Sequence, residues 1–344
     1  MVPAPYLLYI GNAADELSIK TSRGLAQWRP QMCVGQYRHR DCRISLGLPD
    51  MSFQDAARSK AQTLVLGIAN AGGVLDDDIV SDVIDALGVG LNVASGLHAR
   101  LRDNPLIAAA ADRAGKRLFD VRDPPSDLTV GTGCRRKGRR LLTVGTDCSV
   151  GKMYTTLALE REMRGRGLLA DFRATGQTGI LIAGSGVPVD AVVADFISGS
   201  VEQLTPDRTD GGWDLIEGQG SLFHPSFAGV SLGLLHGAQA DALVLCHEPG
   251  REHMRGLPGR ALPDLAECLD ANLTAAKLTN PDVVAVGVAL NTSLLSANEA
   301  RRICQQVSGA LGLPCQDPVR DGVALLVDRL TRHFSLRADS KAYA

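Results

Sequence analysis

The residues that most clearly suggest chemistry lie in one short stretch near the middle of the chain. An apolar run at 141–145 leads into a glycine-bounded loop, and a helical pattern follows from 153 to 163. A strand, a glycine loop, a Gly-Lys pair and a helix in this order predict a phosphate-binding loop, or P-loop. Backbone N–H groups and the helix N-terminus attract anions there, and the lysine adds a full positive charge. The residues expected to hold the ligand are Gly145, Thr146, Asp147, Cys148, Ser149, Val150, Gly151, Lys152 and Met153.

This loop departs from the common P-loop in two ways. Five residues, 146–150, separate the glycines where four are usual, and Met153 stands where a Ser or Thr hydroxyl normally holds Mg²⁺. Thr155 or Thr156 can supply a hydroxyl, but neither sits at the usual place. A carboxylate beside phosphates is repulsive, so we expect Asp147 to orient the loop or to face an amine. A tight turn without a ligand is the alternative interpretation.

Two further glycine-rich loops follow expected strands, at 175–179 and at 217–224. In open α/β sheets, ligands bind at the carboxyl ends of the strands, so these loops and the P-loop form one predicted site. Each loop taken alone also fits a simple tight turn. The candidate substrate-binding residues near these strand ends are Thr178, Gln219, Ser221 and Arg251.

Two side chains in the third loop are candidates for proton transfer. Glu217 ends an apolar strand, where a carboxylate can hold a metal, accept a hydrogen bond from an amine or act as a base. His224 lies in a loop where an imidazole can accept a proton. The alternatives are that Glu217 caps a turn and that His224 is structural. Arg251 can fork onto a carboxylate, and a solvated loop position is the alternative.

The elements that position these loops alternate between strands and helices. In the first half, strands are expected at 6–10, 63–68, 91–94 and 118–121, with helices at 77–87 and 105–114, which predicts a parallel sheet of about four strands. The glycines of 69–73 are expected to form a turn after the second of these strands. A linker at 123–127 places the border between the domains before Arg140.

The second half continues the alternation. Strands are expected at 141–145, 171–174, 213–216, 242–246 and 283–290, and helices at 153–163, 189–204, 232–239, 262–277, 299–311 and 323–332. The chain is therefore predicted to be an α/β protein with two domains, 1–130 and 131–344. The second domain is expected to be a doubly wound parallel sheet that carries the P-loop.

Composition narrows the functional classes. Of 344 residues, 36 are Lys or Arg and 38 are Asp or Glu, so no global positive field exists to attract nucleic acid. No stretch approaches the length of a membrane-spanning helix, and no signal peptide is evident. The eight cysteines lack CxxC spacing, which is typical of reduced thiols. We therefore expect a cytoplasmic protein without membrane or nucleic-acid partners.

Several motifs together resemble known families. Residues 145–152 are similar to the P-loop of dethiobiotin synthetase, which also has five residues between its glycines, and 217–220 looks like its Mg²⁺-holding Glu-Gly-Ala-Gly. The motifs at 146–153, 174–179, 217–225, 235–237 and 245–247 together resemble a bacterial family long catalogued as of unknown function. Its members are described as D-glutamate N-acetyltransferases with a Rossmann-like N-terminal domain and a C-terminal P-loop domain.

The resemblance implies acetyl transfer from acetyl-CoA to the amine of D-glutamate, in D-amino acid catabolism, by a homodimer. The reaction needs a base, for which Glu217 and His224 are the candidates, and it requires no metal. An ATP- and Mg²⁺-dependent ligase or kinase of the dethiobiotin synthetase type is the alternative, with Lys152 on the phosphates and Glu217 on the metal. A nucleotide-sensing module without catalysis is a third hypothesis.

Overall fold

The structure is a computed structural model that describes residues 2–16, 18–68 and 75–341. The chain forms two compact units. Met1–Pro124 and Gly176–Ala191 make the first, and Pro125–Thr175 and Val192–Ala344 make the second. The first unit thus takes a short segment from the second half of the chain. The division into domains 1–130 and 131–344 stays a prediction, and the glycines of 69–73 lie outside the described residues.

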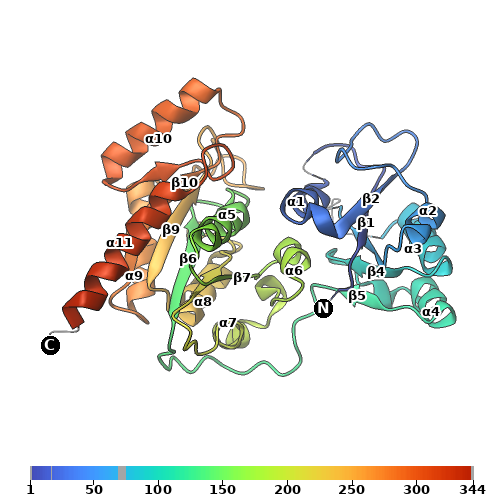
Figure 1. Cartoon of the computed structure of the whole chain (residues 1–344), viewed down its shortest axis with the longest axis horizontal. Helices are drawn as coiled ribbons and strands as arrows, with labels where there is room; N and C mark the ends of the chain where they lie inside the picture. The colour runs from blue at the N-terminus through green and yellow to red at the C-terminus, as the bar shows by residue number, and fades with distance from the viewer. Residues whose placement is uncertain (1, 17, 69–74, 342–344) are drawn as a thin grey trace. The chain divides into compact units, whose positions relative to one another are not determined.

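The first unit is built on a five-stranded parallel sheet in the order β2-β1-β3-β4-β5 (Figure 1). About four strands were expected, and the sheet has five. Its strands are β1 (Tyr6–Gly11), β2 (Cys33–Arg38), β3 (Thr63–Leu66), β4 (Asn92–Ser95) and β5 (Leu118–Asp120). Its helices are α1 (Lys20–Trp28), η1 (Pro30–Met32), α2 (Phe53–Arg58), α3 (Asp77–Gly88), η3 (Leu101–Asp103), α4 (Pro105–Ala114), α6 (Gln177–Ala183) and η4 (Val189–Ala191).

The second unit is built on a six-stranded parallel sheet in the order β11-β10-β9-β6-β8-β7. Its strands are β6 (Arg139–Gly145), β7 (Ala170–Arg173), β8 (Trp213–Ile216), β9 (Ala242–His247), β10 (Val284–Leu290) and β11 (Cys315–Gln316). Its helices are α5 (Lys152–Gly165), η5 (Ala194–Phe196), α7 (Ile197–Leu204), α8 (Ala228–Ala238), α9 (Leu265–Lys277), α10 (Ala297–Leu311) and α11 (Ala324–Lys341).

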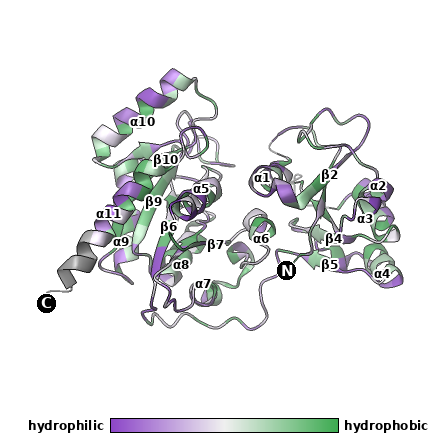
Figure 2. Ribbon diagram, in the orientation of Figure 1, coloured by the Kyte–Doolittle hydropathy of each residue, from purple (hydrophilic) through white to green (hydrophobic). Residues whose placement is uncertain are grey.

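The second unit is doubly wound, because helices cover both faces of its sheet. α5 packs against α11, whereas α7, α8 and α9 pack in series (Figure 1). Strands β9 and β10 are nearly continuous apolar runs, as expected for a parallel sheet that is buried on both faces. Figure 2 shows β9 and β10 in the hydrophobic colour, and each residue of β9 from Ala242 to Cys246 is fully buried.

The expected helix over 189–204 was wrong. The structure has two separate 3₁₀ turns, η4 and η5, before α7 begins at Ile197. The apolar residues that suggested one helix serve two cores, because η4 belongs to the first unit and α7 to the second. Val193 lies between the two 3₁₀ turns and is 65% exposed. No helix within the described ranges is long and apolar enough to cross a membrane.

The register of the second sheet decides which loops meet. Gly145 at the end of β6 pairs with Cys246 of β9, and Leu142 pairs with Ile216 of β8. The sheet order reverses at β6, and the carboxyl ends of the strands at such a switch point are where α/β sheets bind ligands. The P-loop, the loop after β8 and the segment after β9 therefore emerge together at one edge.

Candidate functional site

The P-loop joins β6 to α5 and has the backbone of an anion nest. Gly151 caps α5 with a left-handed φ of 102°, and Ser149 also has a positive φ of 56°. The first N–H groups of a helix have no partner within the helix, so those at the start of α5 are donors for a ligand. The Lys152 side chain is buried, and Nζ donates to the backbone carbonyl of Asp147 at 2.7 Å. Burial lowers the pKa of Lys152.

Asp147 lies within this loop as a fully buried carboxylate. Oδ1 accepts a hydrogen bond from the backbone N–H of Cys148 at 2.6 Å. Oδ2 accepts from the Arg251 guanidinium and from the backbone N–H of Arg255, both at 2.8 Å. The carboxylate is thus paired with a cation and with two amides. Of the two roles expected for it, the structure places Asp147 in contacts that orient the loop.

The segment after β9 contacts the P-loop over several residues. The Arg251 guanidinium also donates to the carbonyls of Cys148 and Ser149, at 2.7 and 3.2 Å, and pairs with Glu248. Nδ1 of His247 lies 2.9 Å from the hydroxyl of Thr146. Burial and then the positive charge of Arg251 lower the pKa of His247 to about 4, so this imidazole is neutral at pH 7.

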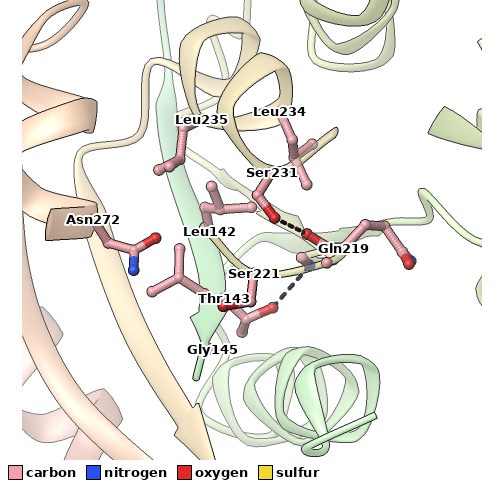
Figure 3. A pocket seen from close by; sticks show the side chains of 12 residues that line it. Leu142, Thr143, Gly145, Gln219, Ser221, Ser231, Leu234, Leu235 and Asn272 are labelled. Atoms are coloured by element: carbon pink, nitrogen blue, oxygen red, sulfur yellow. Dashed lines mark hydrogen bonds between the residues drawn. The ribbon is translucent and has the colours of Figure 1, made fainter. Parts of the chain in front are cut away.

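Glu217 lies at the end of β8, with its side chain buried. Its Oε2 accepts from the backbone N–H of Thr175 at 3.0 Å, and the Thr175 hydroxyl donates to the Glu217 carbonyl at 2.6 Å. Gly218 follows it and passes close to β6, where its N–H donates to the Thr143 hydroxyl at 2.9 Å (Figure 3). A Cβ on Gly218 would lie 1.7 Å from the Thr143 carbonyl oxygen, so no larger residue fits. Nothing in the sequence pattern had singled out Thr143 beyond its being a polar residue in an apolar strand.

His224 is buried, and both its ring nitrogens contact backbone groups. Nδ1 accepts from the N–H of Ser226 at 3.2 Å. Because Nδ1 is an acceptor there, Nε2 carries the proton and donates to the carbonyl of Arg255, 3.0 Å away. His224 therefore links the loop after β8 to the segment after β9.

The predicted substrate-binding residues fall into two groups. In the second unit, Ser221 donates to the carbonyl of Thr146 at 3.1 Å, and Nε2 of Gln219 donates to the Thr175 hydroxyl at 3.3 Å. Ser221, like Arg251, therefore contacts the P-loop, whereas Gln219 contacts the loop after β7. Thr178 belongs to α6 of the first unit, where its hydroxyl lies 2.8 Å from that of Thr21.

A small cavity is lined by residues of β6, of the loop after β8 and of α8 (Figure 3). Its apolar wall comes from Leu142 of β6 and from Leu234 and Leu235 of α8. The Ser231 hydroxyl of α8 donates to the carbonyl of Gln219 at 2.7 Å. This hydrogen bond attaches the loop after β8 to α8.

Most side chains that could bind a metal ion near the P-loop already make hydrogen bonds within the protein. Thr155 and Thr156 donate to the carbonyls of Gly151 and Lys152, at 3.0 and 2.8 Å. Asp147, Cys148 and His224 offer ligand atoms that all lie within 4.8 Å of one another. Both nitrogens of His224 already make the hydrogen bonds described above, so a cation bound by this ring would have to replace one of them.

Comparison with known proteins gives a consistent assignment. Residues 129–327 match "Domain of unknown function (DUF1611_C) P-loop domain", and residues 33–124 match "Domain of unknown function (DUF1611_N) Rossmann-like domain". A structure described as a DUF1611 family protein from Anabaena variabilis superposes with a TM-score of 0.84. It is 32% identical and covers 96% of this chain and 100% of its own.

Two curated relatives carry a functional name. A protein from Pseudoalteromonas sp is named D-glutamate N-acetyltransferase and is 51% identical over 329 residues, which are 96% of this chain and 99% of the relative. A protein with the same name from Tritonibacter scottomollicae is also 51% identical, over 330 residues and the same shares of both chains. The chain therefore belongs to the DUF1611 family, and its Rossmann-like and P-loop domains confirm the fold class and the family predicted from its motifs.

Proposed function

We propose that this protein is an N-acetyltransferase that moves the acetyl group of acetyl-CoA to the amine of D-glutamate. The observation that carries the proposal is the identity of 51%, across 96% of the chain, to two proteins named D-glutamate N-acetyltransferase. That name supports acetyl transfer to an amine. Acetyl-CoA as the donor and a role in D-amino acid catabolism are the finer parts of the proposal.

The P-loop supports coenzyme A as the acetyl carrier. Coenzyme A contains a diphosphate, and the start of α5 with Lys152 offers amide donors and a cation to such a group. Acyl transfer breaks no phosphate bond, so it needs no hydroxyl to hold Mg²⁺. Met153 is compatible with this use, because it leaves anion binding intact and omits the metal ligand.

We propose Glu217 as the general base. The amine of D-glutamate is protonated at pH 7 and must lose a proton before it attacks the thioester. Glu217 is a buried carboxylate at the carboxyl edge of the sheet, and it accepts a hydrogen bond from the N–H of Thr175. The His224 nitrogens contact backbone groups on both sides, which favours a positioning role for this ring. We propose that Ser221 and Gln219 contribute to substrate binding.

The Arg251 guanidinium contacts Asp147 and the carbonyls of Cys148 and Ser149. Binding the carboxylates of D-glutamate would require it to leave these groups. We therefore propose that Arg251 contacts the P-loop and does not bind the substrate carboxylates.

The experiment is to incubate the purified protein with acetyl-CoA and D-glutamate and to follow free thiol with time. We expect thiol release that depends on both substrates, with N-acetyl-D-glutamate detected by mass spectrometry. L-glutamate in place of D-glutamate is the matched control for stereochemistry. A parallel reaction with ATP, Mg²⁺ and D-glutamate tests the ligase or kinase alternative. ADP formation without thiol release would replace the proposal with that alternative.

Two accompanying properties are predictions of the same proposal, namely a homodimer and a cytoplasmic location. Light scattering of the purified protein measures its mass in solution. A mass equal to one chain would remove the homodimer.

A further inference from the structure

Asp147 is a negative charge in the loop that the proposed function assigns to a diphosphate. A carboxylate and a phosphate are both negatively charged and repel each other, and the repulsion is strongest where water is excluded. The Asp147 side chain is fully buried, so solvent does not screen it. A carboxylate in an anion site must therefore do something else that outweighs its repulsion of the ligand.

The contacts of Asp147 indicate what that contribution is. One oxygen accepts from the N–H of Cys148 within the loop, and the other accepts from Arg251 and from the N–H of Arg255. A buried carboxylate with two amide donors and a guanidinium is held in one orientation. The carboxylate thus joins the P-loop to a segment that lies about a hundred residues later in the chain, since Arg251 is 104 positions from Asp147.

Arg251 extends the same connection along the loop. Its guanidinium donates to the carbonyls of Cys148 and Ser149, at 2.7 and 3.2 Å, and pairs with Glu248. Arg255 also donates to the hydroxyl of Ser149. The carbonyls of Cys148 and Ser149 therefore point toward the segment after β9. Because a peptide's N–H points away from its own C=O, fixing these carbonyls also fixes the direction of the adjoining N–H groups.

We propose that Asp147 and Arg251 form a clamp of positioning residues, which holds the P-loop in the shape that binds the diphosphate of coenzyme A. The clamp is defined as Asp147, Arg251 and the groups of residues 148, 149 and 255 that they contact. This inference rests on the proposed function for the identity of the ligand. The clamp itself rests on contacts within the second unit.

Whether Asp147→Asn strengthens or weakens anion binding distinguishes a positioning role from an effect of charge alone. In Asp147→Asn the charge is lost, while Oδ1 still accepts from the N–H of Cys148. If Asp147 acted only through its charge, its removal would strengthen the binding of an anion. If it positions the loop, the loss of the charge-assisted bond to Arg251 weakens binding, on the order of tenfold. The two effects have opposite signs.

The experiment is calorimetric titration of coenzyme A into the wild-type protein and into Asp147→Asn, Arg251→Lys and Glu252→Gln. Arg251→Lys keeps the charge and loses the planar fork, so we expect it to weaken binding as Asp147→Asn does. Glu252 is an exposed acid in the same segment, so Glu252→Gln removes the same charge as Asp147→Asn without touching the clamp. We expect the affinity of this control to stay within about twofold of wild type.

Kinetics distinguish positioning from general damage. We expect Asp147→Asn and Arg251→Lys to raise the KM for acetyl-CoA and to leave the KM for D-glutamate unchanged. Equal or tighter binding of coenzyme A by Asp147→Asn, in a protein that unfolds at the wild-type temperature, would overturn the clamp. If Asp147→Asn does not fold, unchanged affinity in Arg251→Lys has the same consequence.

The proposed function and the clamp fail in different ways. If the wild-type protein does not bind coenzyme A, the proposed function loses its ligand, and the titrations are repeated with inorganic pyrophosphate. Weaker pyrophosphate binding by Asp147→Asn than by Glu252→Gln still supports the clamp. Equal pyrophosphate binding by the two variants, or none by the wild type, overturns it.

Discussion

The ammonium of Lys152 donates a hydrogen bond to the backbone carbonyl of Asp147, five residues earlier, at 2.7 Å. The P-loop therefore folds around its own lysine, and burial of that ammonium lowers its pKa. A bound diphosphate would give the charge a stronger partner than a neutral carbonyl. This relationship places Lys152 at the centre of the proposed anion site.

We predict that Lys152→Met weakens the binding of coenzyme A several-fold, because it removes the buried charge and keeps most of the side-chain volume. Calorimetric titration measures the affinity. Lys277→Met is the matched control, because Lys277 is an exposed lysine at the end of α9 and its loss should leave the affinity unchanged. Unchanged affinity in Lys152→Met would remove the P-loop from coenzyme A binding.

Glu217→Gln is predicted to lower kcat by about 10²–10⁴, which is the usual contribution of a general base. The amide oxygen can still accept from the N–H of Thr175, so we expect the folded structure to persist. Thiol release from acetyl-CoA measures kcat. His224→Gln is the comparison, with an expected loss of less than about tenfold, because we assign that ring to positioning. A larger loss in His224→Gln than in Glu217→Gln would exchange the two roles.

Gly218→Ala is predicted to destabilise the second unit by about 3 kcal/mol or more, since its Cβ would meet the Thr143 carbonyl oxygen at 1.7 Å. Urea unfolding measures the change. Gly229→Ala serves as the control, because a Cβ at this position in α8 meets open space. We expect that variant to be neutral or more stable by up to about 1 kcal/mol, since alanine favours helix. Equal midpoints for the two variants would contradict the close approach of Gly218 to β6.

His247 is predicted to make the protein less stable in acid. Its pKa falls from an ordinary value of 6.5 to about 4 in the folded state. As the pH falls below 6.5 the unfolded chain takes up a proton that the folded chain takes up only near pH 4. Stability that is present above pH 6.5 is therefore lost between pH 6.5 and 4.

The measurement is the urea midpoint at pH 7.5 and at pH 5, for the wild type and for His247→Asn. An asparagine keeps a polar group near the Thr146 hydroxyl and does not titrate, so we expect the acid-induced fall to be smaller in the variant. His98→Asn, at an exposed position, is the control and should fall as the wild type does. An equal fall in His247→Asn and the wild type would rule out His247 as the source.

The local sequence pattern determined most of the strands, the P-loop and the family of this protein. Apolar runs bounded by glycine predicted most strands, and the glycine loop before Lys152 predicted the P-loop, because strand, turn and helix start are set by residues near each other in the chain. The motifs also indicated the family that the comparisons confirm. The pattern failed at 189–204, where neighbouring apolar residues enter two different cores.

Only the tertiary structure decided what the site residues touch. Asp147 and Arg251 stand 104 positions apart, and Thr143 contacts the N–H of Gly218 across 75 positions. These pairs form because β9 and β8 flank β6, which is a property of strand order. Strand order depends on how whole helices and strands pack together, and no short stretch of sequence records it. The residue types of the site were therefore readable in the chain, whereas the contacts between them came from the sheet.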